Sequence, residues 1–248
     1  MKYEPRIYRN DLSEGRFHYF NVTEEESDLQ IGVGAKEYND RIHKRTSEMV
    51  KSLRDQLKNY ILQHPDFLNS HRPVEVDDLA PEIAGLMIKH SVAANVGPMA
   101  AVAGAFAELI GTQLCKEFDL KELIVENGGD LWIKAMKPVT VRIDAGPSSL
   151  SGLIGIEIQQ EQTPCGICTS SGSTGHSFSY GKADAVTVVS EFASAADAWA
   201  TSMCNRIHAK EDLRKEVTLS QRISGITGVV AIMQEAVAVS GNITIKKV

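Results

Sequence analysis

The sequence has no surplus of positive charge. Its 26 lysine and arginine residues are outnumbered by 32 aspartate and glutamate residues, and the formal net charge is −6. Residues 125–248 hold 12 acidic and 11 basic residues, so no basic region is concentrated in the second half. Because nucleic-acid binding needs clustered basic side chains that neutralise phosphates, we expect no DNA or RNA partner.

Long apolar runs, an apolar leader and a lipidation cysteine are also missing. No stretch is apolar enough, by inspection, to cross a bilayer, and residues 1–6 contain no apolar signal core. These absences predict a cytoplasmic protein that does not bind membranes. Cysteine is scarce as well, and in a cytoplasmic protein the four thiols should be reduced: Cys115, Cys165, Cys168 and Cys204.

The clearest element that the sequence does contain is a long helix. Eight residues between Ile42 and Ile61 recur at helical spacing and form one largely apolar face. Asn39 or Asp40 can cap the start of the helix, and His64–Pro65 ends it. Charged residues fill the opposite face, so the helix should lie on a sheet with one side in water.

Small residues dominate the next region. Residues 93–107 hold seven alanines and two glycines, and Pro98 is of the type favoured at the first position of a helix. We therefore expect a short helix from about Pro81 to His90 and a second one from about Pro98 to Glu117. The small residues of the second helix could pack closely against a sheet, a ligand or another copy of the chain.

Strand signals dominate the remainder. Beyond the early strands 3–9, 16–22 and 29–33, apolar runs between turn residues predict strands at 120–126, 131–135, 138–144, 151–159, 165–170, 183–190, 228–233 and 241–247. One helix is expected from about Ala195 to His208. This order predicts an α+β fold with antiparallel sheets and two related β–α halves, in one domain 1–248 whose halves could be 1–118 and 119–248.

Three segments could carry chemistry, and each also has a structural explanation. Gly128, Gly129 and Asp130 follow a predicted strand, which is typical of a hairpin turn; glycines also let backbone amides approach a ligand closely. Thr169, Ser170, Ser171 and Gly172 open a segment rich in Gly, Ser and Thr that ends near His176. Such a segment is either a flexible loop or a phosphate site with a histidine that can move a proton.

The third segment is the start of the helix near residue 195. Asp197 and Thr201 are four residues apart, so their oxygens project from one helix face and form a donor pair suited to Mg²⁺. The alternative is a capping box, in which Ser194 caps the helix and Asp197 occupies its third position.

The pair Cys165 and Cys168 has the spacing of a redox dithiol or of half a zinc site. Within a strand, however, alternation places the two thiols on opposite faces, which favours structural packing. The histidines outside the Gly/Ser/Thr-rich segment are expected on the surface or at a helix end: His18, His43, His64, His71, His90 and His208.

Taken together, these segments resemble the ApbE family of flavin transferases. The resemblance rests on four motifs that occur in the family's order: Val96-Gly97-Pro98, Asn127-Gly128-Gly129-Asp130, Thr169-Ser170-Ser171-Gly172 and Ala196-Asp197-Ala198-Trp199-Ala200-Thr201. The short chain is most similar to a small prokaryotic branch of ApbE-like proteins.

The resemblance implies two tunnelling-fold-like halves with a flavin-nucleotide cleft between them. It implies that FAD is cleaved at its pyrophosphate and that FMN is transferred to a Thr or Ser of an acceptor protein. Asp197 and Thr201 would hold Mg²⁺, the residues around Gly128 and Thr169 would line the nucleotide, and His176 would be the base.

The chain also departs from the family pattern. The family's Asp-Pro-x-Thr-Gly after the Thr-Ser-Gly loop is missing, and only residues 176–181 stand in that interval. Three hypotheses therefore remain: a Mg²⁺-dependent flavin transferase or FAD pyrophosphatase, a flavin-, pterin- or nucleotide-binding protein without the chemistry, and an oligomeric protein without a ligand.

Overall fold

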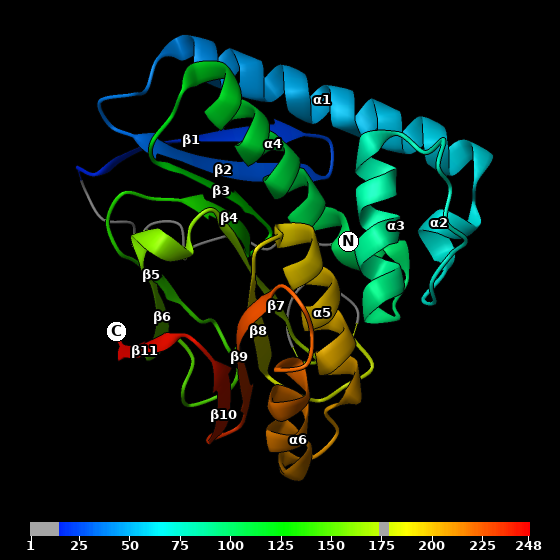
Figure 1. Ribbon diagram of the computed structural model, residues 1–248, viewed down its shortest axis with the longest axis vertical. Helices are drawn as coiled ribbons and strands as arrows, with labels where there is room; N and C mark the ends of the chain where they lie inside the picture. The colour runs from blue at the N-terminus through cyan, green and yellow to red at the C-terminus, as the bar shows by residue number, and fades with distance from the viewer. Residues whose placement is uncertain (1–14, 174–178) are drawn as a thin grey trace.

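An eight-stranded antiparallel sheet forms the centre of the computed structural model, which describes residues 15–173 and 179–248 (Figure 1). The strand order is β1-β2-β3-β4-β7-β8-β9-β10, and a smaller sheet has the order β11-β6-β5. The strands are β1 Phe17–Glu24, β2 Ser27–Gly34, β3 Leu123–Asn127, β4 Asp130–Lys134, β5 Val139–Arg142, β6 Ile154–Ile158, β7 Cys165–Ser170, β8 Ala185–Ser190, β9 Ile226–Met233, β10 Ala236–Gly241 and β11 Thr244–Lys247.

The helices lie on one face of the large sheet and the small sheet lies on the other (Figure 1). Their bounds are α1 Asp40–Gln63, α2 Asp66–Asn69, α3 Glu82–Ala94, α4 Val102–Phe118, α5 Ala193–Arg206 and α6 Lys210–Ser220, with short 3-10 helices η2 Pro98–Ala101 and η3 Gln160–Gln162. Each face of the sheet therefore has its own apolar core. Residues such as Leu123 and Val186 pack under the helices, whereas Ile133 and Val189 pack against β5 and β6.

The large sheet is built from two units with the same order of elements. Strands β1 and β2 are followed by helices and then by β3 and β4; strands β7 and β8 are followed by α5 and α6 and then by β9 and β10. The units join where β4 pairs with β7. The predicted α+β fold with antiparallel sheets and packed helices is confirmed. Because β2 pairs with β3 along five residues, we propose that the two halves of the domain meet between β4 and β7 and not at residue 118.

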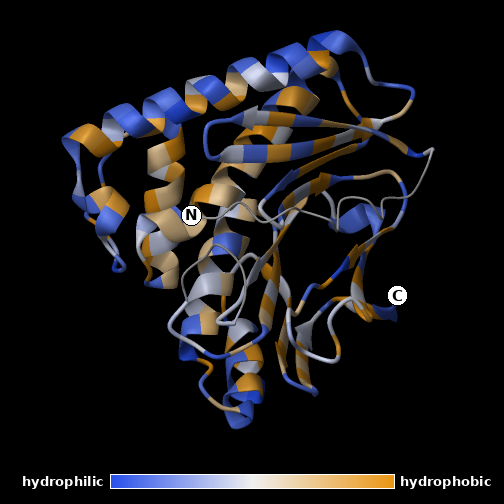
Figure 2. Cartoon of the chain, turned by 180° about the vertical axis from the view of Figure 1, so that it is seen from behind, coloured by the Kyte–Doolittle hydropathy of each residue, from blue (hydrophilic) through white to orange (hydrophobic). Residues whose placement is uncertain are grey.

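Helix α1 follows the sequence-based prediction closely. The Asn39 side chain caps its start by accepting a hydrogen bond from the Arg41 backbone amide at 3.1 Å, and His64 is its last cap residue. The predicted apolar face is buried at Ile42, Thr46, Met49, Val50, Leu57 and Tyr60. Figure 2 shows α1 as a largely hydrophilic helix with hydrophobic positions at intervals, as expected for a helix with one face in water.

Helix α4 is more apolar than expected from the sequence, and its small residues pack closely as predicted. The segment Pro98–Phe118 is, by length and composition alone, apolar enough to span a membrane, contrary to our reading of the sequence. Its composition is explained by burial, because α4 packs on β3 and β4 and contacts α1, α3 and α5. The close packing expected of its small residues is found at Gly111, where a Cβ would lie 2.3 Å from the Trp132 ring.

Two segments near the C-terminus differ from the sequence-based predictions, and one predicted strand near the N-terminus could not be compared. Helix α6 was not predicted, because its buried residues form only a narrow stripe: Leu213, Glu216, Val217 and Ser220. The strand expected at 241–247 is in fact the end of β10, a turn and β11. The strand expected at 3–9 lies outside the described residues.

Candidate functional site

The Gly128–Gly129 segment is the turn of the β3–β4 hairpin. Asn127 pairs with Asp130, and the two glycines between them have φ values of 66° and 97°. Both values lie in the left-handed region, which glycine adopts without steric cost and which this type of two-residue turn requires. The Gly129 amide donates to Glu126 Oε1 at 2.7 Å. The hairpin interpretation is confirmed, and the turn places Asp130 at the start of β4.

Asp130 is buried at the boundary between the two units. Its Oδ1 accepts a hydrogen bond from the Thr169 backbone amide of β7 at 3.1 Å. The residue as a whole is 6% exposed. Burial raises the pKa of the Asp130 carboxyl well above its usual range, and the nearby negative charge of Asp197 raises it further. Asp197 belongs to the other half of the fold, so each half contributes one acid whose charge acts at this boundary.

The predicted Gly/Ser/Thr-rich segment that begins at Thr169 is only partly a loop, because its first two residues belong to β7. Thr169 and Ser170 are the last residues of β7, and the Thr169 hydroxyl shares a 2.8 Å hydrogen bond with Thr187 on β8. Ser170 is buried beside Cys204. Ser171 and Gly172 follow the strand, and the Gly172 amide donates to the Ala183 carbonyl at 2.8 Å. His176 lies outside the described residues.

Helix α5 begins differently from the predicted capping box. Its first residue is Ala193 and its N-cap, Phe192, makes no side-chain capping hydrogen bond. Ser194 is the second residue, and its backbone amide and hydroxyl both donate to Glu108 Oε2 on α4, at 3.0 and 2.7 Å. The capping-box prediction is therefore wrong, because a carboxylate from a neighbouring helix does the capping.

Asp197 is the fifth residue of α5, and it stabilises another helix. Its Oδ2 accepts a hydrogen bond from the Gly104 amide in the first turn of α4 at 2.9 Å. Burial raises the pKa of the Asp197 carboxyl to about 7, although the amides of Gly104 and Ala103 act in the opposite direction. The residue as a whole is half-buried.

The oxygen donors around Asp197 are of the type that binds Mg²⁺. Thr201 lies one helical turn further along α5, is 8% exposed, and its hydroxyl makes no hydrogen bond with the residues that the structure describes. Within residues 15–173 and 179–248, no three His, Cys, Asp or Glu side chains group as metal ligands. The two carboxylates and one hydroxyl form instead a hard-oxygen set, which fits a cation that keeps several waters.

Comparison with known protein families identifies the family to which this chain belongs. The family model described as AbpE bacteria matches residues 9–240. The chain belongs to the AbpE family. Two relatives are described as UPF0280 proteins: one from Methanocaldococcus jannaschii is 38% identical over 223 residues, covering 88% of each chain, and one from Methanococcus maripaludis is 45% identical over 209 residues, covering 83% of this chain and 84% of its own.

Solved structures with the same fold include ApbE proteins. The flavinyl transferase ApbE of Pseudomonas stutzeri has a TM-score of 0.61 at 14% identity, covering 93% of this chain and 95% of its own. The ApbE protein of Thermotoga maritima has a TM-score of 0.61 at 14% identity, covering 90% and 97%. At this identity the likeness shows the fold, and the predicted resemblance to ApbE-like proteins is confirmed.

The cysteines of this AbpE-family chain are free thiols. Cys165 faces the small sheet and Cys168 faces the helices, so the prediction that they lie on opposite faces of the strand is confirmed. Cys168 is nevertheless close to the candidate site: its thiol donates to the Ala193 carbonyl at 3.3 Å, and burial, followed by the charges of Asp130 and Asp197, raises its pKa well above the usual value.

One histidine was placed wrongly from the sequence. His90 was expected on the surface, but it is 7% exposed and lies 5.6 Å from the Phe192 ring, centroid to centroid. Helical spacing put it beside other buried residues of α3, and this signal could have identified it.

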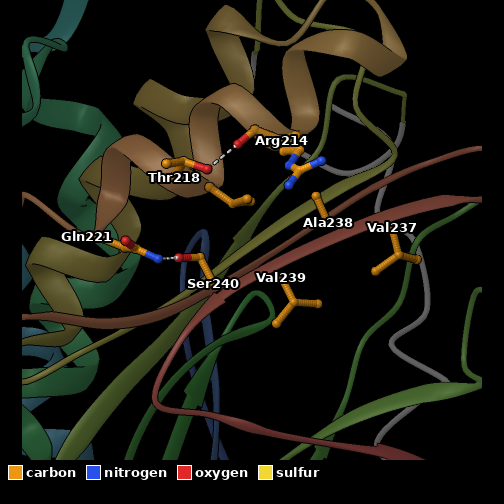
Figure 3. A pocket seen from close by; sticks show the side chains of 8 residues that line it. Arg214, Thr218, Gln221, Val237, Ala238, Val239 and Ser240 are labelled. Atoms are coloured by element: carbon orange, nitrogen blue, oxygen red, sulfur yellow. Dashed lines mark hydrogen bonds between the residues drawn. The ribbon is translucent and has the colours of Figure 1, made fainter.

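Two surface grooves lie among other residues of the AbpE-family fold. The groove in Figure 3, about 380 Å³, lies between α6 and β10, and there Gln221 donates to the Ser240 hydroxyl at 2.8 Å. The second, about 520 Å³, includes Tyr60, His64 and Asp77. Neither groove is lined by a residue that was predicted to bind the nucleotide or the metal.

Sequence reasoning missed Glu108 and Gly104 as members of the site. Glu108 was not singled out from the sequence, and Gly104 was counted only among the small residues of 93–107. The sequence offered one signal, a glycine inside a predicted helix. The structure gives its reason, since a Cβ at Gly104 would lie 2.3 Å from the Ala193 carbonyl oxygen and 2.9 Å from Asp197 Cβ.

Proposed function

We propose that this protein is a Mg²⁺-dependent flavin transferase of the ApbE type, with FAD as the nucleotide substrate and a hydroxyl of an acceptor protein as the receiving group. The observation that carries the proposal is a pair of carboxylates from the two halves of the fold: Asp130 of β4, held by the Thr169 amide, and Asp197 of α5, held by the Gly104 amide, with α5 packed on both β4 and β7. Membership of the AbpE family and the likeness to structures described as flavin transferases support it.

The carboxylate pair supports a cation site on physical grounds. Two like charges in a buried place raise each other's pKa, and a divalent cation between them would remove that cost. Asp130, Asp197 and Thr201 would hold Mg²⁺, which when bound would neutralise the negative charge of a pyrophosphate. The glycine turn at 128–129 exposes backbone close to Asp130, where a ligand phosphate could approach without a side chain in its way.

The proposed reaction forms one bond to phosphorus and breaks another. The acceptor hydroxyl oxygen attacks the phosphorus on the FMN side of FAD, the pyrophosphate P–O bond breaks, and AMP leaves with the bond's electron pair. A base must take the hydroxyl proton, and His176 is our candidate for that role. With water in place of the acceptor hydroxyl, the same residues would make the protein an FAD pyrophosphatase that releases FMN and AMP.

A second candidate function is binding without turnover. The sequence lacks the family's Asp-Pro-x-Thr-Gly after the loop that contains His176, so the groups that would assist transfer could have been lost while the cleft was kept. In that case the protein would bind a flavin, a pterin or another nucleotide and release it unchanged.

One assay separates the two functions. The purified protein is incubated with FAD and MgCl₂, with and without a peptide library that carries Ser or Thr acceptors, and AMP, FMN and flavinylated peptide are measured by chromatography and mass spectrometry. FAD binding is measured in parallel by fluorescence. The variants are Asp197→Asn, Asp130→Asn and Thr201→Val, and Asp55→Asn on the exposed face of α1 is the charge-matched control.

We expect AMP release from wild type and the control, and a loss of at least about 100-fold in the three site variants, because the metal ligands would be removed. FAD binding without AMP release, in wild type and with every acceptor tested, would favour the binding function. No FAD binding and no AMP release would refute the transferase function and would exclude FAD as the ligand of the binding function.

A further inference from the structure

The first turns of α4 and α5 are packed so closely that neither has room for larger residues. A Cβ on Gly104 of α4 would lie 2.3 Å from the Ala193 carbonyl oxygen, and a Cβ on Gly166 of β7 would lie 2.1 Å from Ala193 Cα. Ala193, the first residue of α5, is therefore held between α4 on one side and β7 on the other. At this separation, side chains of each helix reach the backbone of the other.

Each of the two helices supplies the cap that the other lacks. The first amides of a helix have no partners within it and need outside acceptors. The N-cap residues Ala101 of α4 and Phe192 of α5 make no capping side-chain hydrogen bond. Glu108 of α4 accepts from the Ser194 amide and hydroxyl at 3.0 and 2.7 Å, and Asp197 of α5 accepts from the Gly104 amide at 2.9 Å.

Because each helix caps the other, the position of Glu108 on α4 affects the position of Asp197 on α5. Glu108 lies one turn beyond Gly104 on α4, and Ser194 lies one turn before Asp197 on α5. If the Glu108–Ser194 contact is lost, the start of α5 loses its cap and one of its two hydrogen-bonded attachments to α4. The Asp197 carboxylate, which accepts the hydrogen bond from the Gly104 amide, would then no longer be held in one position.

We propose that Glu108 is a positioning residue, which holds the start of α5 on α4 through Ser194 so that Asp197 is placed to bind a divalent cation together with Asp130. The proposal rests on the cation site of the proposed function and adds a residue to it. Hydrogen-bond partners that orient metal ligands typically change metal affinity about 10–100-fold when they are removed, and Glu108 acts on Asp197 one step further out, through Ser194.

The experiment measures Mn²⁺ binding by isothermal titration calorimetry and electron paramagnetic resonance, at a temperature where every variant is folded by circular dichroism. Glu108→Ala removes the acceptor, whereas Glu108→Gln keeps an acceptor oxygen of the same reach and removes the charge. We expect Glu108→Ala to weaken Mn²⁺ binding about 10–100-fold, and Glu108→Gln to bind within about threefold of wild type.

Should Glu108→Ala fail to fold, Glu108→Asp replaces it, since its carboxylate is one methylene shorter and should give a smaller loss of the same sign. Wild-type affinity in Glu108→Ala, or in Glu108→Asp where it replaces that variant, would overturn the proposal. An equal loss in Glu108→Gln would also overturn it, because the effect would then come from charge and not from the hydrogen bonds to Ser194. If wild type itself binds no Mn²⁺, the cation site of the proposed function fails, and this inference fails with it.

Discussion

Replacing Gly104 by alanine adds one methyl group where α4 and α5 touch. That Cβ would lie 2.3 Å from the Ala193 carbonyl oxygen, 2.6 Å from its carbonyl carbon and 2.9 Å from Asp197 Cβ. Two of the three nearest atoms belong to backbone, so they cannot move aside as the end of a flexible side chain could. The helices must separate, and the hydrogen bond from the Gly104 amide to Asp197 Oδ2 must lengthen or break.

The free energy of unfolding should fall for two reasons and rise for one. Overpacking of a close contact costs about 1–3 kcal/mol, and loss of a buried hydrogen bond to a charged group costs about 1.5–3 kcal/mol. Alanine is a better helix former than glycine by about 1 kcal/mol. The net result is a destabilisation of roughly 2–4 kcal/mol, which for a chain of this size lowers Tm by roughly 5–15 °C.

Gly85→Ala is the matched control for this substitution. Gly85 is also a helical glycine, in α3, but a Cβ there meets nothing within 4 Å. It should therefore show only the gain in helix propensity, about 0.5–1 kcal/mol of stabilisation. Urea and thermal denaturation, followed by circular dichroism, measure both variants. If Gly104→Ala is as stable as wild type, or is stabilised like Gly85→Ala, the close packing of α4 on α5 is refuted.

Three further predictions concern protons and thiols. Because burial raises the pKa of Asp197 to about 7, Mn²⁺ affinity should rise about tenfold between pH 6 and pH 8 as the carboxyl ionises; calorimetry at several pH values tests this, and a flat profile contradicts it. Burial, aided by the charge of Lys89, lowers the pKa of His90 to about 4. The unfolded chain therefore takes up a proton first as the pH falls from 6.5 towards 4, and the protein should lose roughly 3 kcal/mol of stability over that range. In His90→Leu this part of the pH dependence should vanish, and a variant that keeps it would refute the assignment. In native protein a thiol reagent should modify the half-buried Cys115 first and reach the buried Cys168 only on unfolding; rapid modification of Cys168, measured by mass spectrometry, would contradict its burial.

Local patterns were sufficient for the elements whose reasons are local. The apolar face of α1 and its Asn39 cap could be predicted because both depend on residues within a few positions of one another. The Gly128–Gly129 hairpin is a similar case, since a two-residue turn of this type needs positive φ values that glycine supplies. Strand alternation also placed Cys165 and Cys168 on opposite faces.

The errors occurred where distant segments decide the outcome. Ser194 and Asp197 have the spacing of a capping box, yet their partners are Glu108 and Gly104, about ninety residues earlier in the chain. Helix α6 carries too narrow an apolar stripe to be recognised alone, and it is stabilised by packing on β9 and β10.

The sequence by itself determined the types and order of most elements and four motifs whose order indicates the family, because helical periodicity, strand alternation and turn chemistry act over a few residues. Only the tertiary structure decided which acids stand together. Asp130 and Asp197 lie at the same boundary because β4 pairs with β7 and α5 packs on both strands, and the partner of each helix cap depends on how closely α4 and α5 approach. Such contacts join residues far apart in the chain, and no local pattern records them.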